Sequence, residues 1–154
     1  MAAFRFRAAV ALDLRLKQET DALVERARVQ ALFLEAKRAV DAEVARRDTA
    51  RTDLVALERS GAELDTLLWH RNWIVRLTAN ADGLQRDLYE RAKDVRTADE
   101  AWHEARRRRL ALERMKDRAW QRYQKAELRE EMKQMDELAR IRYVMPDAWR
   151  PREG

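Results

Sequence analysis

No proline occurs between Met1 and Met145, and this absence constrains the fold more than any other feature of the chain. Proline interrupts helices because it lacks a backbone N–H donor and its ring clashes with the preceding turn. Glycine interrupts the run only in Ser60–Gly61 and Asp82–Gly83, and glycine is typical of helix C-termini and turns. The spacing predicts a first long helix at 13–59, a short helix at 62–80, a last long helix at 84–143 and a tail at 144–154.

The composition indicates that these helices pair instead of forming a globular core. Charged residues make up 40% of the chain, and it contains only 3 Gly and 2 Pro. Such a profile is typical of long helices and coiled coils. At 1.5 Å per residue, the two outer helices would be roughly 70 and 90 Å long. We therefore expect an all-α fold, a single elongated domain over 1–154, with two long helices in an antiparallel coiled-coil hairpin and a short helix near the bend.

Apolar residues recur along both long helices at steps of three and four, the rhythm of a coiled-coil seam. In the first helix the predicted seam contains Leu16, Leu23, Ala27, Leu34 and Val44. In the last helix it contains Leu84, Leu88, Val95, Ala98, Trp102, Ala105, Leu112, Ala119, Tyr123 and Ala126. After a phase shift it continues through Leu128, Met132, Met135 and Leu138.

The predicted short helix has apolar residues on two adjacent faces. Leucines and branched residues such as Ile74 form one face, while Trp69, Trp73 and Leu77 form the other. A helix of this kind buries both faces or leaves one for a partner. We expect it to fold back onto the long helices, with the tryptophans as the alternative partner contact.

The residues give no indication of an enzyme, a cofactor or a metal site. The chain has no cysteine, and its two histidines, His70 and His103, are far apart in sequence. It lacks a Gly-rich phosphate loop and a serine elbow. No stretch reaches the length of a transmembrane helix, and the apolar run at Ala8–Leu12 is too short for a signal peptide. We therefore expect a cytoplasmic, unprocessed protein.

The net charge of +5 raises the question of nucleic-acid binding. Four consecutive arginines, Arg106–Arg109, are the best candidate, but consecutive residues point in different directions around a helix. The following stretch, LERMKDRAWQRYQKAELREEMKQMDELA at Leu112–Ala139, carries equal numbers of acidic and basic residues. Nucleic-acid affinity depends on a net positive surface that releases counterions. The pattern favours contact with helices or with an acidic protein surface over contact with phosphates.

Two motifs, one near each end of the chain, resemble the FliJ family of flagellar type III export proteins. FRFRAAVALDLRLKQE at Phe4–Glu19 is similar to the N-terminus of that family, with paired aromatics followed by a charged helix. LERMKDR, followed by RYxKxE at Arg122–Glu127, an EE pair and K-x-x-D-E-L-A, resembles the family's C-terminal signature. The resemblance in detail covers about residues 1–23 and 106–143.

The resemblance implies a non-enzymatic stalk and escort protein. Members of the family are coiled coils similar to the central stalk of rotary ATPases. They engage the export ATPase ring, the export gate protein and export chaperones, at the cytoplasmic face of the inner membrane. Carried over to this chain, the contact residues would be Phe4, Phe6, Arg114, Arg118, Trp120, Arg122 and Tyr123 at the paired termini, and Trp69 and Trp73 near the bend.

Other interpretations remain open from the sequence alone. An injectisome counterpart would share the architecture, and the terminal motifs favour the flagellar protein. A generic coiled-coil scaffold or adaptor would show the same periodicity. A basic nucleic-acid-binding protein is the third alternative. The tail VMPDAWRPREG, including Trp149, lies outside both motifs and has no assigned role.

Overall fold

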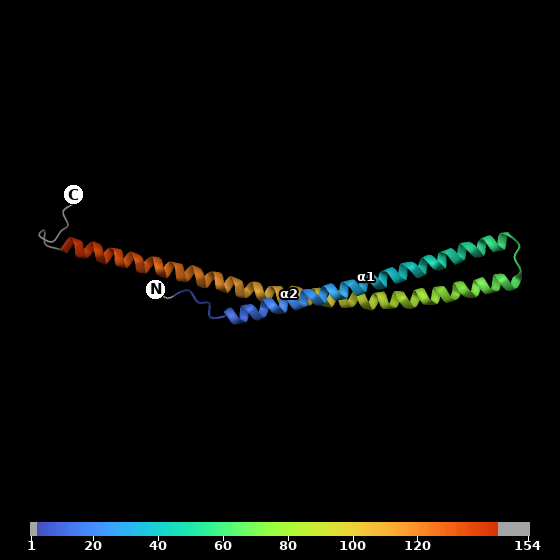
Figure 1. Ribbon diagram of the computed structural model, residues 1–154, viewed down its shortest axis with the longest axis horizontal. Helices are drawn as coiled ribbons and strands as arrows, with labels where there is room; N and C mark the ends of the chain where they lie inside the picture. Colours follow the sequence, from blue (N-terminus) through green and yellow to red (C-terminus); the bar gives the residue numbers. More distant parts are fainter. Residues whose placement is uncertain (1–2, 145–154) are drawn as a thin grey trace. The chain divides into compact units, whose positions relative to one another are not determined.

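The computed structural model describes residues 3–144, which contain two helices and no strand. Helix α1 spans Ala9–Arg59 and helix α2 spans Leu64–Val144 (Figure 1). The chain divides into two compact units. We call Leu16–Arg107 the hairpin unit, and we call Met1–Arg15 with Arg108–Gly154 the terminal unit. The all-helical prediction is confirmed, whereas the tail at 145–154, with Trp149, lies outside the described residues.

The bend between the helices is a glycine-dependent C-cap. Gly61 has a φ of 75°, in the left-handed region that glycine adopts without steric cost. The Ala62 N–H donates to the Leu57 carbonyl at 3.1 Å and the Gly61 N–H donates to the Glu58 carbonyl at 3.4 Å. This pair of bonds is a Schellman motif, which satisfies carbonyls that the helix end leaves free. The turn predicted at Ser60–Gly61 is therefore confirmed.

The second predicted break is wrong, because α2 continues through Asp82–Gly83 without interruption. The short helix and the last long helix are thus one element. A glycine inside a helix costs roughly 1 kcal/mol relative to alanine, which is too little to end a helix that packs on both sides of it. Leu77 and Ala81 before the glycine are buried, and Leu84 after it is half-buried.

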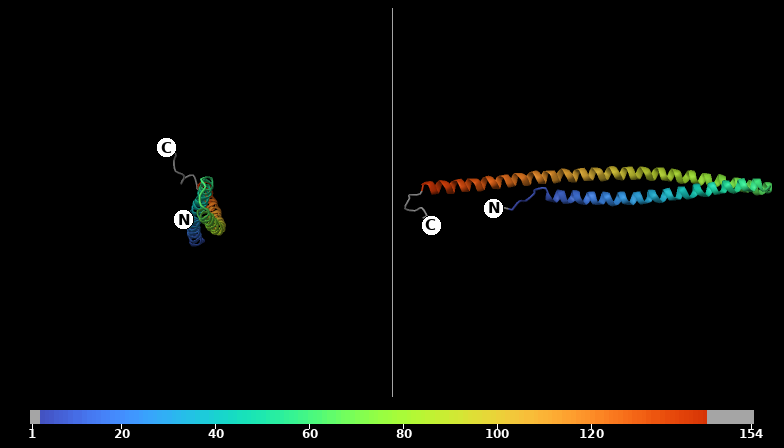
Figure 2. Two further views of the ribbon diagram at one scale, coloured as in Figure 1. Left: turned by 90° about the vertical axis from the view of Figure 1, so that its right-hand side faces the viewer. Right: turned by 90° about the horizontal axis from the view of Figure 1, so that it is seen from above.

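Within the hairpin unit, α1 and α2 lie side by side along their lengths (Figure 1 and Figure 2). Their facing residues follow an unbroken three-four rhythm, and every one is buried or half-buried. On α1 these are Glu19, Ala22, Arg26, Val29, Phe33, Ala36, Val40, Glu43, Arg47, Ala50, Leu54 and Leu57. On α2 they are Leu67, His70, Ile74, Leu77, Ala81, Leu84, Leu88, Arg91, Val95, Ala98, Trp102 and Ala105.

The seam predicted for the last helix is confirmed within this unit, but the one predicted for the first helix is wrong by one residue. Leu16, Leu23 and Leu34 are exposed, and the seam runs through the residues that precede them. The true row contains charged residues, whose aliphatic stems cover apolar surface while their heads reach water or a partner. Arg26 shows how this works, because its guanidinium donates to Asp99 on α2 and lies 4.8 Å over the Trp102 ring.

The terminal unit is built differently. Residues Ala3–Arg7 form no helix, and the Ala9 N–H donates to the Phe6 carbonyl at 3.2 Å as α1 begins. Leu12 on α1 is buried, while Leu112 and Ala119 on α2 are half-buried. From residue 128 to Val144, every residue of α2 is exposed. No helix of the described residues is long and apolar enough to cross a membrane.

Candidate partner-binding surfaces

An aromatic cluster attaches the N-terminal segment to α2 in the terminal unit. The Phe4 ring meets the Trp120 ring edge-on, with centroids 5.0 Å apart, and lies 5.5 Å from the Tyr123 ring. Trp120 and Tyr123 stack at 5.5 Å. Aromatic pairs at these separations attract each other beyond their buried area. Three of the residues that the terminal motifs single out therefore form one contact cluster.

The Tyr123 hydroxyl donates to the Glu127 carboxylate one turn further along α2. This hydrogen bond, together with partial burial, raises the pKa of Tyr123 above its ordinary value. The phenol therefore stays neutral across the physiological pH range. Its orientation is fixed by the rings on one side and by the carboxylate on the other.

A basic groove lies next to the aromatic cluster. It is lined by Arg5, Phe6 and Arg7 of the N-terminal segment and by Met115, Arg118 and Arg122 of α2. Sequence reasoning singled out Phe6, Arg118 and Arg122 but missed Arg5 and Arg7. The alternation of phenylalanine and arginine in FRFR was the signal that could have found them.

Arg114 is exposed and does not line this groove. The structure thus brings together six of the seven terminal residues that the motifs indicate, either in the aromatic cluster or in the groove. Arg114 lies on the same helix, one turn before Arg118.

The exposed end of α2 presents apolar side chains with nothing covering them in the described residues. Met135 is 70% exposed and Leu138 is 64% exposed, although both belong to the predicted continuation of the seam. Leu128 and Met132 are exposed as well, and Ile141 extends the row. We call this row the apolar stripe. Unbranched methionines adapt to irregular partner surfaces, so such a row is typical of a docking face.

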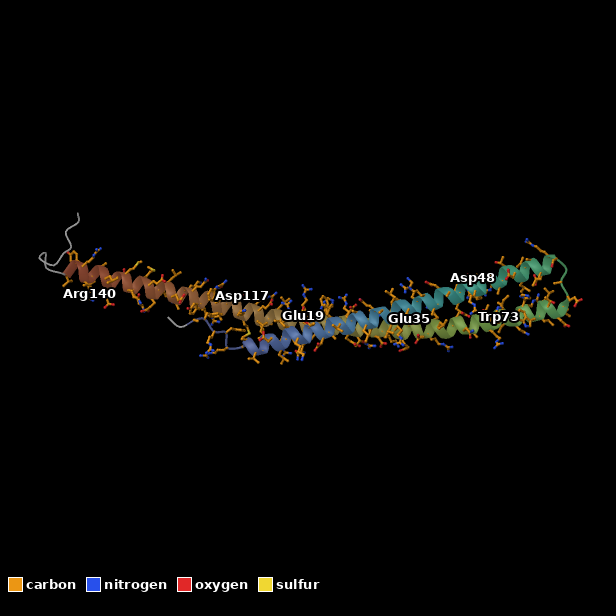
Figure 3. All side chains as sticks on the ribbon, viewed as in Figure 1. Glu19, Glu35, Asp48, Trp73, Asp117 and Arg140 are labelled. Carbon is orange, nitrogen blue, oxygen red and sulfur yellow. The ribbon has the colours of Figure 1, made fainter. Side chains whose placement is uncertain are left out.

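A second aromatic surface lies near the bend, in the hairpin unit. Trp69 and Trp73 stack with centroids 6.3 Å apart, and His70 meets Trp69 edge-on at 5.0 Å. The Arg46 guanidinium lies 5.6 Å from the centre of the Trp73 ring, which Figure 3 labels on α2. Trp69 remains 62% exposed. These residues line a shallow open groove together with Ala50.

This region is covered on one face only. Ile74 is half-buried and Leu77 is buried against α1, while Leu64, Val75 and Trp69 remain exposed. An ion pair of 3.0 Å between Arg71 and Glu58 joins the two helices beside the bend. The expected return of this segment onto a long helix is thus observed for one face, and the other face remains open.

The arginine run at 106–109 is engaged within the protein. In the hairpin unit, Arg106 lies 5.4 Å over the Trp102 ring and Arg107 pairs with Glu104 at 2.6 Å. In the terminal unit, Arg109 pairs with Glu113 at 2.7 Å. A surface that binds phosphates needs free cations, so this arrangement does not favour nucleic-acid binding.

No group of three or more potential metal ligands gathers anywhere in residues 3–144. The features with binding chemistry in these residues are thus the aromatic cluster, the basic groove and the apolar stripe of the terminal unit, and the tryptophan surface of the hairpin unit.

Comparison with known proteins identifies a family. The family model described as "Flagellar FliJ protein" matches residues 7–146, which is nearly the whole chain. Searches of curated proteins and of solved structures found no match.

Proposed function

The chain belongs to the FliJ family of flagellar proteins, a family of non-catalytic export components, and from that premise we propose that it acts as a stalk and escort in flagellar protein export. In this role it engages the export ATPase ring, the export gate protein and export chaperones. It works in the cytoplasm, at the cytoplasmic face of the inner membrane, where its partners hold it.

The observation that carries the proposal is the make-up of the terminal unit. This unit combines an aromatic cluster, a groove lined by four arginines and a row of exposed apolar side chains. Interfaces are enriched in aromatic residues, methionine and arginine, whereas charged residues are depleted from their centres. The terminal unit therefore has the composition of a docking surface, and we assign the ATPase ring to it.

The tryptophan surface supports a second contact, which we assign to the export gate. Tryptophan and arginine are the residue types that most often dominate binding energy at interfaces. Trp69 is exposed beside Trp73 and Arg46, so a partner could cover it without any rearrangement of the hairpin. The two surfaces belong to different units, which would let the two partners be bound independently.

The test is capture of the cognate export ATPase by the purified full chain. Changing Arg114, Arg118 and Arg122 to Glu reverses the charge of the α2 surface. We expect this variant to lose most of the captured ATPase, because like charges across an interface repel and correct pairs are lost. A matched control changes Arg76, Arg86 and Arg96, which are exposed in the hairpin unit, to Glu.

The control variant should capture the ATPase as the unchanged chain does. Equal capture by both triple variants would refute the assignment of the ring to the terminal unit. Trp69→Ala with Trp73→Ala should leave ATPase capture intact and weaken capture of the gate protein. Loss of the ATPase from that tryptophan variant would reverse the two assignments.

A further inference from the structure

The basic groove of the terminal unit is lined by positively charged side chains that form no ion pairs with other described residues. Its volume is about 490 Å³. Arg5 and Arg7 of the N-terminal segment line it together with Arg118 and Arg122 of α2, and its apolar lining includes Phe6 and Met115. The lining contains no carboxylate.

None of the four arginines makes an ion pair within residues 3–144. Within the described residues, the guanidinium groups of these arginines make one hydrogen bond, in which the Arg122 Nε–H donates to the Arg118 backbone carbonyl at 3.3 Å. Two nearby carboxylates are engaged elsewhere, since Glu113 pairs with Arg109 and Glu127 accepts from Tyr123. Asp117, next to Arg118, does not line the groove. The groove therefore gathers four arginines that make no ion pair in the described residues.

The combination of charged and apolar residues in the groove indicates the chemistry of its ligand. The lining combines four guanidinium groups with the apolar side chains of Phe6 and Met115, so the best ligand carries several carboxylates and an apolar side chain. Arginine binds carboxylates through paired N–H donors, and such charge-assisted hydrogen bonds are roughly twice as strong as neutral ones. Met115 is exposed in the lining of the groove and can adapt to the apolar side chain.

We propose that the basic groove binds an acidic, amphipathic peptide segment of a protein partner, with its apolar side chain between Phe6 and Met115 and its carboxylates on the four arginines. That this partner belongs to the export apparatus follows from the proposed function, on which this part of the inference rests. It goes beyond that function by naming the chemistry of the segment and by including Arg5 and Arg7.

Phosphate-bearing partners fit the groove less well. A nucleic acid needs a continuous positive surface and free aromatic faces on which bases stack. Here the rings of Trp120 and Tyr123 stack on each other and contact Phe4. An anionic membrane would meet the acidic pairs Glu130–Glu131 and Asp136–Glu137, which are exposed further along α2.

The test uses the full chain and a labelled synthetic peptide in which glutamates flank a single leucine, with binding followed by fluorescence anisotropy. Two groove variants, Arg5→Glu with Arg7→Glu and Arg118→Glu with Arg122→Glu, should each weaken binding by about tenfold or more. The matched control is Lys125→Glu with Arg129→Glu, which makes the same charge change on α2 outside the groove. It should bind the peptide as the unchanged chain does.

Peptide controls separate the two parts of the site. Replacing the glutamates by glutamines should abolish binding, and replacing the leucine by alanine should weaken it several-fold. Added salt should weaken binding by the unchanged chain, because exposed charges are screened. Circular dichroism checks that each variant keeps its helices, and Arg118→Gln with Arg122→Gln replaces the charge-reversed pair if that pair unfolds.

Three results would overturn the proposal. The first is equal weakening by the groove and control variants, which would indicate a net-charge effect. The second is unchanged binding of the glutamine peptide. The third is tighter, groove-dependent binding of an oligonucleotide or of phosphatidylglycerol vesicles than of the peptide.

Failure of the groove and failure of the proposed function are distinguishable. Peptide binding that does not depend on the groove, together with ATPase capture that survives both groove variants, would overturn the groove proposal and leave the function standing. Groove-dependent peptide binding by a chain that captures no export component would support the groove and contradict the function.

Discussion

The hairpin unit and the terminal unit use similar residues for different purposes. In the hairpin unit, small and charged residues form a seam in which two helices cover each other, and Leu77 is only 1% exposed. In the terminal unit, the N-terminal segment covers part of α2, and the apolar stripe beyond it is not covered by any described residue. The hairpin unit therefore has a continuous buried seam between two helices, whereas much of the apolar surface of α2 in the terminal unit is exposed.

Among the variants that test this difference, Leu77→Ala is expected to change the free energy of unfolding most. Removing a fully buried leucine leaves a cavity, so the free energy of unfolding should fall by about 2–4 kcal/mol. Leu138→Ala in the apolar stripe is the control and should change it by less than about 0.5 kcal/mol, because the side chain is already in water. Urea unfolding followed by circular dichroism measures both. Equal effects would remove the distinction between the two units.

Glu43→Met tests whether the buried carboxylate in the seam lowers the stability of the protein. Glu43 is buried on α1, and its Oε1 atom has no hydrogen-bond partner among residues 3–144, while Oε2 accepts from Arg46 at 3.2 Å. An apolar side chain of similar length should raise the free energy of unfolding by about 1–2 kcal/mol. Glu35→Met, at an exposed position of the same helix that Figure 3 labels, should change it little. A destabilised Glu43 variant would show that the carboxylate has a partner in solution.

Phe4→Ala should loosen the terminal unit and leave the hairpin unit intact. The ring contacts with Trp120 and Tyr123 contribute about 1 kcal/mol each at most, so the N-terminal segment should detach without loss of helix. The readouts are faster proteolysis near Arg5 and Arg7 and a change in tryptophan fluorescence. Val10→Ala, an exposed position in the same unit, serves as the control. Global unfolding of the Phe4 variant would mean that the two units are not separate in stability.

Gly83→Ala should give the smallest effect, a stabilisation of about 0.5–1 kcal/mol. An added Cβ meets no atom within 4 Å, and the glycine lies inside α2. Gly61→Ala is the contrasting variant and should destabilise, because Gly61 holds a positive φ. Thermal unfolding measures both. Destabilisation by the Gly83 change would indicate that α2 bends at this position in solution.

The sequence predicted the helical class, the turn at Gly61 and the register of α2 within the hairpin unit, because those depend on local rules. It did not predict continuity through Gly83, since packing against α1 outweighs a glycine's local cost. Nor did it predict the register of α1, where exposed leucines such as Leu23 resemble a seam more closely than Arg26 and Glu43 do. Those charged residues are buried because of partners on the other helix or neighbours on their own, which no single-helix pattern reveals.

The candidate site was predictable to a similar extent. The motifs indicated the aromatic and arginine residues of α2, and the structure brings most of them into one region. Arg5 and Arg7 were missed, because the groove exists only when the N-terminal segment lies along α2. Sequence spacing contains no information about that approach.

Hydrogen exchange of the full chain, with and without its cognate export ATPase, would show which unit the ATPase covers. We expect new protection in the terminal unit, at residues 3–8 and 112–141, with the hairpin seam at 19–57 unchanged. Local protection is a suitable readout because it reports covering of individual segments and not only overall stability. Protection confined to the bend around Trp69, or no protection anywhere in a complex that forms, would contradict the account.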